Sequence, residues 1–224
     1  MKRIRHRFQG GFTLIELLVV IAIIAILAAM IMSASSRAKL SARRTICLNH
    51  QKQLSVAAAV YVQENEGYYP SSNATNKWPE ALRSGYKNLR VLVCPDDKTS
   101  FAAAVTNALP ADEAPRSFLI NAWTDYFDTL PRPILHEIMP ESVIKEPSTT
   151  IVFGEKEEDT GDFLMDLRTL NELTVLEQSR HIAAGNKGGA NYAFADGSVR
   201  FLPFGRSLQP LNMWAVTPEL RGPK

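Results

Sequence analysis

The sequence has few cysteines and little excess charge, and both shortages exclude classes of protein. Two cysteines, Cys47 and Cys94, are too few for a disulfide-rich mini-scaffold or a four-cysteine zinc site. The net charge is only +2, and residues 33–224 carry 21 Lys and Arg against 22 Asp and Glu. The basic footprint of a nucleic-acid-binding protein is therefore missing, and we expect no nucleic-acid partner. The sequence also lacks the GxGxxG, P-loop and CxxC motifs.

One long apolar run stands near the N-terminus. Residues 12–32 include 19 apolar side chains out of 21, and four Lys and Arg side chains lie within residues 1–7. A helix of this length spans roughly 31 Å, which matches the hydrocarbon core of a bilayer. A secretory signal would have a shorter run, about 7 to 15 residues, with the cleavage site after it. Here the small residues Gly10 and Gly11 lie before the apolar run. The basic residues ahead of them favour a cytoplasmic N-terminus.

The string GFTLIELLVV, from Gly11 to Val20, resembles the cleavage and methylation signature of type IV prepilins and type II secretion pseudopilins. The resemblance implies that a prepilin peptidase cuts after Gly11 and methylates the new amino group of Phe12. Glu16 then becomes the fifth mature residue. A carboxylate in an apolar span is costly unless it has a partner. In pilin-like filaments this acidic residue is thought to neutralise the amine of a neighbouring subunit, which implies an assembly role for Glu16. The alternative is a generic single-span anchor with an incidental Glu.

The helical pattern continues beyond the apolar run. Residues 33–64 contain neither Pro nor Gly, and Gly67 with Pro70 is expected to end the helix. The expected buried stripe, at helical spacing, is Leu40, Cys47, Leu54, Ala58 and Tyr61. We therefore predict a leader at 1–11, a transmembrane or filament-core helix at 12–32, its amphipathic continuation at 33–66 and a soluble head at 67–224.

The soluble part carries a second resemblance, to a large pseudopilin-like family whose members end in a motif called H-X9-DG. The motif residues here are His181, Asp196 and Gly197, but fourteen residues rather than nine separate the His from the Asp. Earlier landmarks of the family are matched by CLNHQKQL from Cys47, VCPDD around Cys94, residues 117–121, and TIVFGE from Thr150. The resemblance implies architecture rather than a specific cargo.

The C-terminal motif also has a plain structural interpretation. Small and aromatic residues alternate over 190–195, polar and apolar residues alternate from Ser198 onward, and Asp196-Gly197 between them is a two-residue hairpin signal. The competing interpretation makes His181 and Asp196 a catalytic or metal pair. One His, without an activated Ser or a second carboxylate at fixed spacing, leaves that constellation incomplete. We therefore expect a β-hairpin and no enzyme.

An acidic loop follows the predicted strand at 150–153. Five carboxylates lie within nine residues from Gly154 onward, and some major pseudopilins bind calcium in this domain. The candidate ligands are Glu155, Glu157, Asp159 and Asp162. Their spacing does not follow the D-x-[DN]-x-[DN]-G loop, so a solvated acidic loop is the alternative and no other cofactor is expected.

The cysteines raise the question of oxidation. If the chain beyond the apolar run lies outside the cytoplasm, Cys47 and Cys94 are expected to be paired. A disulfide between them would close the loop from Cys47 to Cys94 and stabilise the fold by roughly 4 kcal/mol in the chain-entropy model. Two buried thiols are the alternative.

Together these patterns predict an α+β, pilin-like fold: a long N-terminal α-helix, half transmembrane, packed on a small antiparallel β-sheet, with an irregular insertion over 108–147.

The predicted function is a structural subunit of a type II secretion pseudopilus or a type IV pilus-like filament. The expected partners are prepilin peptidase, copies of the chain or other pseudopilins, and the inner-membrane platform of the secretion or pilus system. The expected location is the inner membrane, crossed once, with the C-terminal part periplasmic or extracellular. A membrane-anchored binding protein, such as a minor pilin or adhesin that forms no filament, is the alternative.

Overall fold

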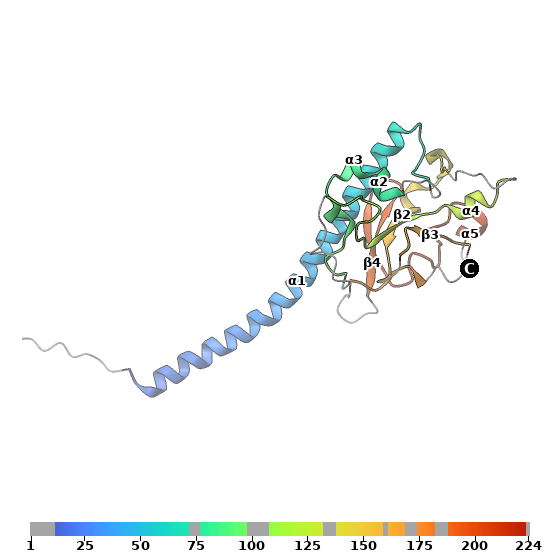
Figure 1. Ribbon diagram of the computed structural model, residues 1–224. Coiled ribbons are helices and arrows are strands. Elements are labelled where there is room, and N and C mark those ends of the chain that lie inside the picture. The colour runs from blue at the N-terminus through green and yellow to red at the C-terminus, as the bar shows by residue number, and fades with distance from the viewer. Residues whose placement is uncertain are drawn as a thin grey trace, which may run out of the picture. The chain divides into compact units, whose positions relative to one another are not determined.

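The computed structural model describes residues 12–71, 77–97, 108–131, 138–158, 161–168, 174–181 and 188–222. The chain forms two compact units that meet at Ala42 and Arg43. From here on, the second unit, from Arg43 onward, is called the head, so the name now includes the C-terminal part of the long helix as well as residues 67–222. Helix α1 (Leu14–Glu64) contributes to both units (Figure 1).

Helix α1 has 51 residues, and its two ends are defined by local signals. At its start, the backbone N–H and the hydroxyl of Thr13 donate to the Glu16 carboxylate, and the Glu16 N–H donates back to the Thr13 hydroxyl. This reciprocal arrangement is a capping box. At its end, Glu66 has a φ of 55°, and the Gly67 N–H donates to the Val62 carbonyl at 2.8 Å, as in a Schellman motif. The expected helix and its end near Gly67 are confirmed.

The part of α1 within the head buries the predicted stripe. Cys47, Leu54 and Ala58 are at most 3% exposed, and Tyr61 is partly buried. Leu40, which belongs to the first unit, is 55% exposed, so its assignment to the stripe was wrong. The regular spacing continues through Leu40, but the neighbours that bury Cys47 and Leu54 belong to the head.

The head contains one five-stranded sheet in the order β3-β1-β2-β4-β5. The strands are β1 (Phe118–Asn121), β2 (Ile151–Glu155), β3 (Leu164–Met165), β4 (Gly189–Phe194) and β5 (Val199–Pro203). Strand β3 pairs with β1 in parallel, and the other pairings are antiparallel. The α+β class is confirmed, with a mixed rather than a purely antiparallel sheet.

Both faces of the sheet are covered, because its strand residues alternate between two buried clusters. Phe118 and Ile120 pack in the cluster that includes Leu54 of α1, whereas Leu119 packs in the cluster that includes Trp214. Short helices complete the head, and α3 lies beside α1 (Figure 1). They are α2 (Trp78–Ala81), α3 (Arg83–Tyr86), η1 (Leu89–Leu92), α4 (Thr124–Phe127), η2 (Glu141–Val143), η3 (Pro147–Thr149) and α5 (Pro218–Arg221).

Two local predictions needed correction. The segment 108–147, expected to be irregular, contains β1, which is an internal strand of the sheet. Its four residues are buried on both faces, so they show no alternation of polar and apolar side chains. The hairpin of β4 and β5 exists, but its turn has three residues, because Phe194 and Ser198 bond across it and only Gly197 has a positive φ, of 80°. A two-residue type I′ turn would need positive φ at Asp196 as well.

Candidate functional site

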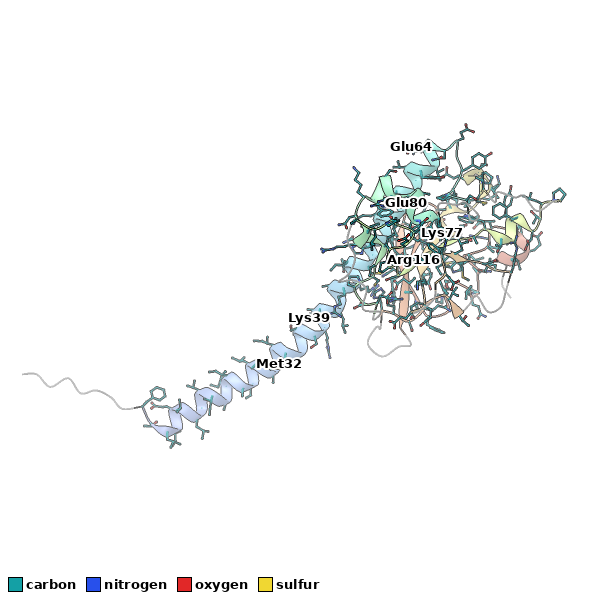
Figure 2. The ribbon with its side chains drawn as sticks, viewed as in Figure 1. Met32, Lys39, Glu64, Lys77, Glu80 and Arg116 are labelled. Atoms are coloured by element: carbon teal, nitrogen blue, oxygen red, sulfur yellow. The ribbon has the colours of Figure 1, made fainter. Side chains whose placement is uncertain are left out.

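The first candidate site is the N-terminal half of α1. This helix is long and apolar enough to cross a membrane, and none of its most apolar stretch is buried. The large apolar side chains from Phe12 to Met32 are 44% to 77% exposed. Figure 2 shows side chains pointing outward on both visible sides of the helix in the stretch that ends at Met32. Apolar exposure on this scale indicates a surface that lipid or other helices cover.

Glu16 is the acidic side chain within this exposed stretch. Its carboxylate accepts from the Thr13 N–H at 2.8 Å and from the Thr13 hydroxyl at 2.7 Å. Sequence reasoning identified Glu16 as a charge in need of a partner but missed the capping box, although the spacing T-x-x-E was visible. Gly11 lies outside the described residues, so its predicted cleavage stays a prediction.

The second candidate site lies inside the head, where four metal-ligating side chains meet. Cys47 comes from α1, Cys94 follows η1, Glu155 ends β2, and His181 precedes β4. One ligand atom from each lies within 4.8 Å of all the others, and the four residues are between 0% and 4% exposed. The backbone N–H and carbonyl of His181 both bond to Gly189, at 2.9 and 3.2 Å, which ties His181 to the start of β4.

Glu155 Oε1 is the centre of this cluster. This oxygen lies 2.9 Å from His181 Nε2, and the Cys47 thiol donates a hydrogen bond to it at 3.4 Å. The backbone N–H of Asn191 also donates to it, at 2.9 Å. Cys94 Sγ lies 3.8 Å from the same His181 nitrogen. Two thiols, one imidazole nitrogen and one carboxylate oxygen thus face a common point.

A second layer of charged groups surrounds the cluster. His181 Nδ1 lies 3.1 Å from Asp96 Oδ2, and Arg180 Nε lies 3.0 Å from Glu155 Oε2. Arg180 also pairs with Asp97 at 3.1 Å, and the Arg180, Asp97 and Glu155 side chains are at most 3% exposed. A buried carboxylate is costly unless it is paired, so Arg180 and His181 are what allow Glu155 to be buried.

The surroundings change the acidity of the histidine and of both thiols. Burial by itself lowers the pKa of His181, but its interactions with Cys94 and Glu155 raise this pKa to about 10. Burial raises the pKa of Cys94, but hydrogen bonds with Cys47 and His181 lower it to about 7. Burial and the hydrogen bond with Cys94 raise the pKa of Cys47. Cys94 is therefore the more acidic of the two thiols.

The two cysteines of the expected disulfide are close together in the structure but not bonded. Cys47 and Cys94 are both free cysteines, so the bond between them is not formed. Their sulfur atoms nevertheless lie within 4.8 Å of each other, in a buried site shared with a histidine and a carboxylate. Sequence reasoning brought the two cysteines together but missed their neighbours Glu155 and His181.

Among the described residues, the predicted calcium ligands are not gathered into one site. Glu155 points into the cysteine cluster, where it pairs with Arg180 and His181. Glu157 is partly exposed, and Asp159 lies outside the described residues. Over the part of the chain that the structure describes, the group of side chains that could hold a metal ion is the cysteine cluster, and Asp162 is not in it. Strand β2 ends at Glu155, and Glu157 and Asp162 lie beyond it, so closeness in sequence did not place these carboxylates together.

His181 and Asp196 likewise occupy different surroundings. The Asp196 carboxylate accepts from the N–H and hydroxyl of Ser198, at 2.8 and 2.6 Å, and thereby caps the hairpin turn. The bonds of the His181 ring described above go instead to Asp96, Glu155 and Cys94. Among the described residues, no hydrogen bond or ion pair joins the two motif side chains, and the structure gives no support to a His181–Asp196 pair.

Comparison with protein-family models matches residues 6–32 to the family described as the prokaryotic N-terminal methylation motif. The match includes Gly11, Phe12 and Glu16. No curated protein and no solved structure matches the chain. The chain thus carries a prepilin-type methylation motif, which supports a type IV pilin-like precursor, and its one apolar N-terminal helix fits a membrane-anchored protein of this kind. The resemblance to the H-X9-DG family stays a prediction.

Proposed function

We propose that this chain is a structural, non-enzymatic prepilin-like subunit. Prepilin peptidase cuts it after Gly11 and methylates Phe12, and the mature chain assembles into a type II secretion pseudopilus or a type IV pilus-like filament. Its partners are copies of itself or other pseudopilins and the inner-membrane platform of that system. Before assembly it resides in the inner membrane, with the N-terminus cytoplasmic and the head on the far side.

The methylation motif over residues 6–32 is the observation that carries this proposal. The exposed apolar surface from Phe12 to Met32 supports it, because such a surface can be covered by lipid before assembly and by neighbouring helices afterward. The motif and the surface coincide in one segment, which a soluble enzyme or a simple binding domain would have no need to expose.

Glu16 has two uses in such a subunit, one within the chain and one between chains, and substitutions can separate them. Within one chain it closes the capping box with Thr13. Between chains, its negative charge would neutralise the methylated amine of a neighbouring Phe12. A glutamine can replace glutamate in a capping box but carries no charge. The two uses therefore respond differently to substitution.

The first experiment determines the mature N-terminus. The full-length chain is expressed with and without a prepilin peptidase and analysed by mass spectrometry. We expect a chain that begins with N-methylated Phe12 when the peptidase is present, and an intact precursor when it is absent. Gly11→Val is expected to abolish cleavage. A chain that keeps its leader in the presence of an active peptidase would refute the proposal.

The second experiment tests assembly with three variants. Glu16→Leu and Glu16→Gln should both be cleaved yet fail to form filaments, whereas Thr13→Ala, which weakens the capping box but keeps the carboxylate, should still assemble. Filaments are counted by electron microscopy of sheared cells. Normal filaments from Glu16→Gln would refute the charge-neutralising role. A wild-type chain that is cleaved but never polymerises would point to the anchored binding protein instead.

A further inference from the structure

Four buried side chains in the head have the composition and placement of a metal site. We propose that Cys47, Cys94, Glu155 and His181 bind one structural Zn²⁺ ion, a role that nothing in the N-terminal motif implies. Zinc in proteins is bound by cysteine sulfur, histidine nitrogen and carboxylate oxygen, commonly with four ligands in a tetrahedron. Paired thiolates with an imidazole favour zinc over the hard, oxygen-seeking cations.

The four ligand atoms lie within 4.8 Å of one another, and two of the distances between them match tetrahedral zinc. With ordinary zinc–ligand bond lengths, a tetrahedral ion holds its ligand atoms about 3.3 to 3.8 Å from one another. Cys47 Sγ lies 3.4 Å from Glu155 Oε1, and Cys94 Sγ lies 3.8 Å from His181 Nε2. The separation of 2.9 Å between His181 Nε2 and Glu155 Oε1 is a hydrogen bond, which a metal ion between them would open by a few tenths of an ångström.

The groups behind the ligands hold them in binding orientation. A zinc-bound histidine usually donates its second ring N–H to a carboxylate, which fixes the tautomer and the direction of the ring. Asp96 Oδ2 lies 3.1 Å from His181 Nδ1 and can take this role, leaving Nε2 directed at Cys94 and Glu155. Arg180 Nε, 3.0 Å from Glu155 Oε2, holds the far oxygen of the carboxylate and leaves Oε1 for the metal.

A buried histidine and carboxylate distinguish this site from a simple disulfide. A disulfide between Cys47 and Cys94 would need only apolar neighbours, whereas a zinc ion would also use the His181 nitrogen and the Glu155 oxygen that lie beside the two thiols. Burying the Glu155 carboxylate and the His181 ring at 0% and 4% exposure is costly, and a bound cation would offset part of that cost. Because all four ligands come from the protein and are buried, the site has no open position for substrate and is structural rather than catalytic.

The ion would connect four segments of the head that are distant in sequence. Cys47 belongs to α1, Cys94 to the loop after η1, Glu155 to β2, and His181 to the segment before β4. Zinc would thus fasten the C-terminal half of the long helix to the sheet. This role does not depend on whether the mature chain polymerises.

The test measures zinc directly in the full-length chain, purified in detergent without an affinity tag. We expect about one zinc per chain by mass spectrometry of the metal, and both thiols protected from a thiol reagent until a chelator is added. Loading with Co²⁺ in place of zinc should produce the absorption bands of cobalt bound by thiolate in a tetrahedral site. Cys47→Ala, Glu155→Gln and His181→Ala should each lose the stoichiometric zinc.

Two further variants keep the test decisive if a ligand substitution prevents folding. Asp96→Asn leaves all four ligands in place and should weaken zinc affinity about 10- to 100-fold. Glu157→Gln removes a partly exposed carboxylate two residues from Glu155 and should leave zinc binding unchanged. A wild-type chain that holds no zinc after incubation with it would overturn the proposal, whether its cysteines are then found as a disulfide or as two free thiols. Retention of zinc by His181→Ala would overturn the ligand assignment.

Discussion

The packing of α1 within the head can be tested where Gly85 of α3 lies against Ala57 of α1. Gly85 lies in α3, and a Cβ atom added there would meet the Cβ of Ala57 at 2.6 Å and its Cα at 2.8 Å. Ordinary van der Waals separations of this kind lie between 3.4 and 4 Å. Ala57 is 2% exposed and belongs to α1, so the clash is with a buried helix backbone that no side-chain rotation can relieve.

We therefore expect Gly85→Ala to destabilise the head. Inserting an extra carbon into a well-packed core costs about 1 to 3 kcal/mol, because the backbone must shift. For a domain of this size, each kcal/mol lowers the melting temperature by roughly 2 to 4 °C. The assay is thermal and urea unfolding of the full-length chain in detergent, followed by circular dichroism, where the detergent-covered N-terminal half of α1 supplies a constant background.

A matched control is provided by Gly161→Ala. Gly161 has nothing within 4 Å of its added Cβ and no positive φ, so this variant should unfold like the wild type. Combining Gly85→Ala with Ala57→Gly should restore part of the lost stability, because the clash with the side chain disappears while the clash with the backbone of residue 57 remains. A Gly85→Ala variant as stable as the control would refute the close packing of α3 on α1.

Three further changes test the rest of the head. Arg180→Met should destabilise it by about 3 to 5 kcal/mol in urea unfolding, because Glu155 and Asp97 lose their buried cation. The exposed pair of Arg168 is the control, and Arg168→Met should cost less than about 1 kcal/mol. Gly197→Ala should cost about 1 to 2 kcal/mol through its φ of 80° alone, since the added Cβ would meet no atom closer than 3.9 Å. Finally, if zinc is present at about 100 times its dissociation constant, a chelator should remove about 2.7 kcal/mol of stability, measured as a lower melting temperature.

Predictions drawn from short stretches of sequence agreed best with the structure. The long helix was predicted by its composition and by the absence of Pro and Gly, and α1 ends three residues before Gly67. The hairpin followed from alternating residues on both sides of Gly197. These signals act between residues that are close in sequence, so the backbone responds to them whatever the rest of the chain does.

Predictions that needed distant partners were incomplete or wrong. Strand β1 was missed, because burial on both faces removes the alternation that marks a strand. Glu155 was grouped with its acidic neighbours in sequence, whereas the sheet turns it toward Cys47 and His181. No spacing rule relates these residues, since their closeness results from the way β2, α1 and the segment before β4 pack together.

The two candidate sites therefore depend on different kinds of information. The methylation motif, the apolar run and Glu16 lie in one continuous stretch of sequence, so linear order alone predicts the proposed processing site and the proposed surface for lipid or neighbouring subunits. The cysteine cluster joins residues from four separate segments, and only tertiary packing placed a second thiol, a histidine and a carboxylate around one buried point. Folding has to offset the loss of hydration of these polar groups, and packing around the sheet determines which of them meet.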